Sequence, residues 1–115
     1  LKFFLENLDS SKYRTDFDIK GCSNYALTLV LQPSAKKLAG KVCEILNQSG
    51  VEFRRGLSGG GNQLRQPYLR KLFGESYREF PNTEHVHFCG FYIGNYPELK
   101  LEKIKALCRR LNSIT

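Results

Sequence analysis

The sequence predicts a small α+β domain: a two-layer sandwich in which a short, mostly antiparallel sheet carries helices on one face. Helical segments with apolar stripes alternate along the chain with three short stretches rich in β-forming residues. Three short strands cannot make a broad doubly wound sheet, so a small sheet covered by helices is the simplest arrangement. The 115 residues have room for one core, and we expect a single domain over residues 1–115.

The first half of the chain is expected to form a helix, a strand and a second helix. Residues 1–8 have the apolar spacing of a helix, and a polar connection follows. Residues 25–31 place leucines at alternate positions and predict a largely buried strand. The second helix is expected to begin with Ser34 as its N-cap and to end at Gly50, in the position after a helix that favours glycine.

The second half is expected to contain two short strands, two short helices and a longer final helix. In chain order, these are a strand at 51–55, a helix at 67–72, a turn at 81–84 that leads into a helix at 85–88, a strand at 90–95 and a helix at 99–111. The first of these strands leads directly into a run of three glycines.

That glycine run opens the stretch with the clearest chemical signal, residues 59–69. Backbone without side chains can approach an anion closely, and hydrogen-bonding side chains follow at once. They are Asn62, Gln63, Arg65 and Gln66. Such a loop suits a phosphate or a polyol. Glycine content alone equally fits a flexible surface loop.

Charge and cysteine content limit the classes of partner. The net charge of +7 favours an anionic partner, but the basic residues are scattered and most fit a solvated surface. No apolar run is long enough to span a bilayer. The four cysteines include no closely spaced pair of the kind that zinc ribbons use. We expect reduced thiols in a cytoplasmic protein.

His85, His87 and Cys89 could form a metal site only if they lay on a strand, where alternate residues share a face. On the helix that we favour, His87 points away from the other two. No nucleophile is placed beside an activating base. Taken alone, the chain fits a binding module better than a complete catalyst.

Several short motifs occur in a characteristic order. They are Gly50-Val51-Glu52-Phe53-Arg54-Arg55, Gly61-Asn62, Arg65-Gln66-Pro67, Pro81-Asn82-Thr83 and Gly90-Phe91-Tyr92-Ile93-Gly94-Asn95. In this order they resemble the C-terminal portion of the DegT/DnrJ/EryC1/StrS family of pyridoxal-phosphate sugar aminotransferases and dehydrases. The glycine–asparagine motif followed by Arg-Gln-Pro resembles the branch of CDP-4-keto-6-deoxyglucose 3-dehydrases. The chain departs from the family where Gly56, in place of the usual proline, follows the arginine pair.

The resemblance implies the C-terminal small domain of a longer enzyme that is active in deoxysugar and lipopolysaccharide biosynthesis. The cofactor, pyridoxal or pyridoxamine 5′-phosphate, would be held mainly by an N-terminal domain outside these residues, and these 115 residues alone would be inactive. The enzyme would be a homodimer. Substrate-binding residues in this chain would be Arg55, Gly61, Asn62, Gln63, Arg65 and Gln66, and no catalytic or metal-binding residue is expected here.

Arginines would supply charge to the phosphates of a nucleotide-linked 4-keto-6-deoxy sugar, and the amides would bind its hydroxyls. The sequence does not distinguish an aminotransferase from a 3-dehydrase. Two other classes remain: a basic nucleic-acid-binding domain and a protein-interaction module without a ligand. The first needs basic and aromatic residues interleaved on one sheet face, whereas residues 25–31 are apolar. We therefore expect neither nucleic acid nor a membrane as partner.

Overall fold

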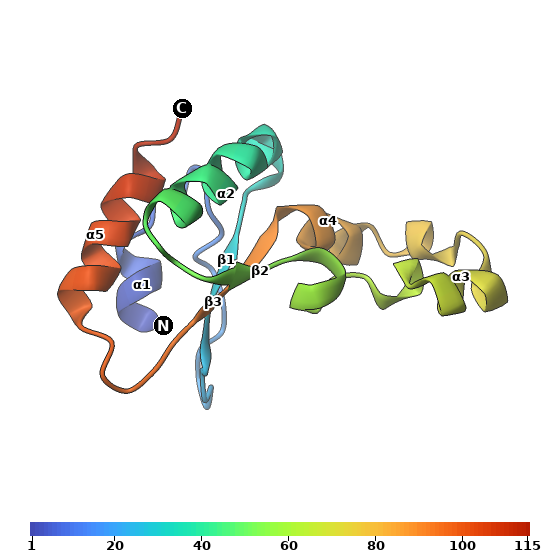
Figure 1. Cartoon of the computed structure of the whole chain (residues 1–115), viewed down its shortest axis with the longest axis horizontal. Helices are drawn as coiled ribbons and strands as arrows, with labels where there is room; N and C mark the ends of the chain where they lie inside the picture. Colours follow the sequence, from blue (N-terminus) through green and yellow to red (C-terminus); the bar gives the residue numbers. More distant parts are fainter.

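The computed structural model describes residues 1–115, which form a three-stranded antiparallel sheet with helices on one face (Figure 1). The strands are β1 (Ala26–Val30), β2 (Phe53–Arg54) and β3 (Gly90–Gly94), in the spatial order β1-β3-β2. The strand that comes last in the sequence therefore lies at the centre of the sheet. The predicted α+β class is confirmed.

Five α-helices and four 3₁₀ turns complete the chain. The helices are α1 (Lys2–Asn7), α2 (Ala39–Gln48), α3 (Pro67–Phe73), α4 (Pro81–Cys89) and α5 (Leu101–Asn112). The 3₁₀ turns are η1 (Pro33–Leu38), η2 (Gly56–Gly59), η3 (Gln63–Arg65) and η4 (Ser76–Glu79). No helix is both long and apolar enough to cross a membrane.

The hydrophobic core lies between the sheet and the layer formed by α1, α2 and α5 (Figure 1). Alternation along β1 and β3 directs one set of apolar side chains toward these helices, each of which contributes its own apolar stripe. Fully buried members of this core include Phe4, Leu27, Leu29, Val42, Leu46, Cys108 and Leu111. The four cysteines are free thiols.

Polar contacts tie the N-terminal segment to α5. The buried Tyr13 hydroxyl donates to the Leu111 carbonyl over 2.7 Å, and burial raises the pKa of this phenol. The Asn112 side chain accepts from the Asp9 backbone N–H and donates to the Asn7 carbonyl. These bonds satisfy backbone groups at the end of α1 that would otherwise lack partners.

Three boundaries differ from the sequence prediction. Ser34 is not an N-cap, because it already lies inside η1, which begins at Pro33 with Gln32 as its N-cap residue. The proline ring fixes a helical φ at this first position, and no side chain caps the turn. Proline in the same position starts α4 at Pro81, ahead of the predicted 85–88. The strand predicted at 51–55 has only two residues, because the Val51 N–H bonds the Leu46 carbonyl and completes the C-terminal cap of α2. Gly50 has the predicted left-handed conformation there, with φ +63°.

Residues 56–89, from η2 to the end of α4, extend away from the sheet; we call this segment the arm (Figure 1). The molecule is correspondingly elongated, with extents of 46 × 32 × 26 Å. The stretch 59–69 lies in the arm, so the arm positions the predicted site residues.

Candidate functional site

Asn62 is the one buried polar residue of the chain, with 2% of its surface exposed. Its side-chain amide donates to the Tyr77 carbonyl over 3.0 Å and to Glu84 Oε1 over 2.9 Å. Its side-chain oxygen accepts from the Leu64 N–H, which caps η3, and its own N–H donates to His87 Nδ1 over 3.0 Å. One residue thus joins the loop to both η4 and α4.

Arg65 and Glu84 form a two-pronged ion pair beside Asn62. Arg65 Nε lies 2.7 Å from Glu84 Oε1, and Nη2 lies 2.6 Å from Oε2. The guanidinium also stacks over the rings of Tyr77, at 4.2 Å, and Phe88, at 4.8 Å. Hydrogen bonds from Arg65, and then from Asn62, lower the pKa of the Glu84 carboxyl. Two of the five N–H donors of Arg65 are therefore used inside the arm, and its charge is balanced there by Glu84.

Arg55 lies at the base of the arm, apart from Asn62 and Arg65. Its Nη2 donates to the Phe88 carbonyl over 2.5 Å, and its Nη1 lies 3.0 Å from Cys43 Sγ. The guanidinium stacks 5.0 Å above the ring of Phe91 in β3. Arg55 thus connects α2, α4 and the central strand.

Gly61 packs too closely against its neighbours to carry a side chain. An added Cβ would lie 2.6 Å from His87 Nδ1 and 2.7 Å from the Gly56 carbonyl oxygen. The Gly61 N–H bonds that same carbonyl over 2.8 Å. Gly59 is packed as closely, against Arg54, whereas a Cβ at Gly60 would meet nothing within 4 Å, so the two outer glycines of the run are the tightly packed ones.

The remaining site candidates face solvent. Gln63 is exposed and makes one long 3.5 Å contact to the Gly61 carbonyl, while Gln66 is half-buried. Next to them is a depression of about 400 Å³, which we call the cationic hollow. Its lining residues are Arg65, Pro67, Arg70, Lys71, Gly74 and Glu75. Arg70 and Lys71 form no ion pair there, and Glu75 is already paired with Arg78.

Both histidines make internal contacts. His85 Nε2 lies 2.7 Å from the Leu31 carbonyl, and His87 Nδ1 accepts from Asn62. The chain contains no group of three or more side chains that could hold a metal ion. Burial, followed by the nearby Arg65 charge, lowers the pKa of His87 below its ordinary 6.5, although Glu84 opposes this shift. His87 is therefore neutral near pH 7 and free to accept the Asn62 hydrogen bond.

The six predicted site residues therefore fall into three groups with different roles in the structure. Gly61, Asn62 and Arg65 form the internal framework of the arm, Arg55 anchors its base, and Gln63 and Gln66 remain available to a ligand. Sequence reasoning missed Tyr77, Glu84 and His87 as partners in this framework. Their sequence separations of 15, 22 and 25 residues from Asn62 leave no local pattern to find them by.

Comparisons with models of protein families, with curated proteins and with solved structures found no match to this chain.

We predict that Gly61→Ala destabilises the protein by about 1–3 kcal/mol, because the added methyl group overlaps His87 and Gly56. The matched control is Gly40→Ala in α2, where a Cβ meets nothing within 4 Å. That control should gain up to about 1 kcal/mol from the higher helix propensity of alanine. Urea denaturation of both variants measures the difference, and a Gly61→Ala variant as stable as the wild type would refute the close packing.

We predict that stability falls as the pH is lowered below the ordinary His87 pKa of 6.5. A lowered folded-state pKa means that the unfolded chain takes up the proton first, and protonated His87 can no longer accept from Asn62. In His87→Asn, the side-chain oxygen can replace Nδ1 as the acceptor and does not titrate. Urea denaturation at pH 7 and about pH 5 should show a smaller loss in this variant than in the wild type. Equal losses would exclude His87 as the cause.

Proposed function

We propose that this chain is the substrate-binding and closing domain of an enzyme that uses pyridoxal or pyridoxamine 5′-phosphate. The substrate is a nucleotide-linked 4-keto-6-deoxy sugar, and the reaction is an amino transfer or a 3-dehydration. The observation that carries the proposal is the hydrogen-bonded arm, which holds three motifs of the resemblance beside an open cationic hollow: Gly61-Asn62, Arg65-Gln66-Pro67 and Pro81-Asn82-Thr83. The following features support it.

The hollow has the charge that a nucleotide diphosphate requires. Arg70 and Lys71 provide two cations without carboxylate partners, and the one carboxylate in the lining, that of Glu75, is paired with Arg78. Gln63 presents an exposed side-chain amide two residues before Arg65, which lines the hollow. An amide can both donate to and accept from sugar hydroxyls. Because the framework around Asn62 already fixes the loop, binding costs little ordering entropy.

The apolar surface of the arm suits closure over a second surface. Seven of the ten large exposed hydrophobic side chains lie in the arm: Leu57, Tyr68, Leu72, Phe73, Phe80, Val86 and Phe88. Apolar side chains gathered on one projection are typical of an interface. In the proposed enzyme they contact the cofactor domain or the partner subunit of a homodimer.

The cofactor itself is held outside these residues in this proposal. A Schiff-base lysine has to lie in a sheltered cleft, but every lysine except Lys12 is exposed, and Lys12 donates to the Asn112 carbonyl. The residues present therefore do not form a pyridoxal-phosphate site. The cofactor supplies the electron sink for the reaction, and this chain binds and orients the substrate.

The test uses the complete natural polypeptide that contains these residues. We expect it to purify with a bound chromophore of the pyridoxal type and to bind the nucleotide sugar. Gln63→Ala should raise the Kd for the sugar about fivefold, as expected for the loss of one hydrogen bond, without changing cofactor content. Asn47→Ala removes an exposed amide in α2, far from the arm, and should leave the Kd unchanged.

Arg65→Ala should also weaken sugar binding while the cofactor stays bound, but it leaves Glu84 without its partner and so also tests the framework. Gln63→Ala separates the two roles. A polypeptide without a pyridoxal cofactor, or salt-sensitive binding of oligonucleotides in place of the sugar, would contradict the proposal. Equal sugar affinity of the wild type and Gln63→Ala would remove Gln63 from the site.

A further inference from the structure

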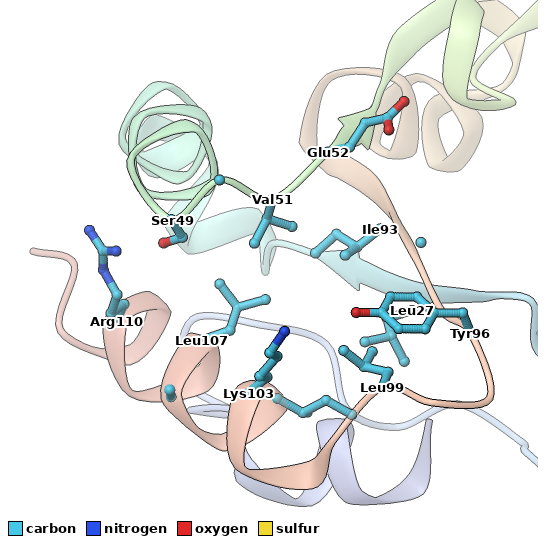
Figure 2. A pocket seen from close by; sticks show the side chains of 14 residues that line it. Leu27, Ser49, Val51, Glu52, Ile93, Tyr96, Leu99, Lys103, Leu107 and Arg110 are labelled. Atoms are coloured by element: carbon cyan, nitrogen blue, oxygen red, sulfur yellow. The ribbon is translucent and has the colours of Figure 1, made fainter.

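A second cavity, of about 650 Å³, lies on the opposite side of the sheet edge from the arm. It opens between α5, the end of α2 and the segment that follows β3 (Figure 2). We call it the apolar pocket. It shares no lining residue with the arm, so an inference about it does not depend on the proposed function.

The pocket exists because β2 is short. Its two residues pair with Ile93 and Tyr92, and the chain before them is held back by the C-terminal cap of α2. The sheet edge therefore stops before it fills the space next to α5. Aliphatic side chains line the interior: Leu27, Val51, Ile93, Leu99, Ile104 and Leu107.

Polar groups are concentrated at the mouth of the pocket, and most of the charge there is positive. Figure 2 shows the Lys103 amino group and the Tyr96 hydroxyl directed toward the apolar pocket, with the Arg110 guanidinium beside Ser49. Lys103 takes part in no ion pair, and the one hydrogen bond of the Arg110 guanidinium is a long contact of 3.4 Å to Gln48. The carboxylate of Glu52 is directed away from the apolar pocket (Figure 2).

We infer that the apolar pocket binds a small amphipathic anion: a molecule with an aliphatic body and a carboxylate head. The aliphatic lining accepts the body, because a cavity with a few placed polar groups at its mouth is the usual form of a small-molecule site. Lys103 binds the head through a charge-assisted hydrogen bond, and Tyr96 donates a second one. Arg110 adds positive charge at the rim.

Decanoate is the probe, added to the chain below the concentration at which it forms micelles. Titration calorimetry should show saturable binding of one molecule, and methyl NMR shifts should change at Val51, Leu99 and Leu107. Lys103→Gln should raise the Kd about fivefold. The matched control, Lys105→Gln, removes the same charge from an exposed position of α5 outside the lining and should leave the Kd unchanged.

Decanol separates the role of the head from that of the body. It should bind more weakly than decanoate and should not distinguish Lys103→Gln from the wild type. Equal effects of the two lysine variants would overturn the inference, because they would indicate general charge attraction. Shifts at Leu72 in place of the pocket methyls, or no saturable binding, would overturn it as well.

Discussion

The arm depends on the burial of one amide, that of Asn62. Between residues 56 and 89, only Tyr77 and Cys89 are buried hydrophobic side chains, so apolar burial alone does little to hold this segment. Two side-chain bonds join Asn62 to η4 and α4, a third caps η3 locally, and the Asn62 N–H donates to His87. A buried polar group without a partner costs about 1–3 kcal/mol, so this network favours one arrangement strongly over any partly bonded one.

This constraint determines which groups a ligand can use. Arg65 has its charge balanced by Glu84, and Asn62 has no free surface, although the composition of the loop suggested both as direct contacts. The groups left open are Gln63, Gln66, Arg70 and Lys71, on the outer side of the same arm. The framework holds the arm in place, and in the proposed function the adjacent solvent-facing groups meet the substrate. Fixing the loop before binding favours affinity, because less freedom is lost on association.

The fold could be predicted from the sequence to the extent that its elements are local. The apolar stripe of α5, the leucine alternation of β1 and the glycine after α2 each gave the correct element within a few residues. The length of β2 could not be predicted, because the cap of α2 competes for Val51. The three glycines suggested mobility, whereas packing against His87, which is distant in the sequence, fixes Gly61. The partners of Asn62 were hidden for the same reason.

Amide hydrogen exchange, followed residue by residue in the intact chain, tests most directly whether the arm is a fixed framework. The amides to compare are those of Gly61, Asn62 and Leu64, which donate to Gly56, His87 and the Asn62 side chain. If the framework is rigid, they exchange as slowly as the amides of β3, through global unfolding. Fast exchange of these three amides while β3 stays protected would show a mobile loop and contradict the account.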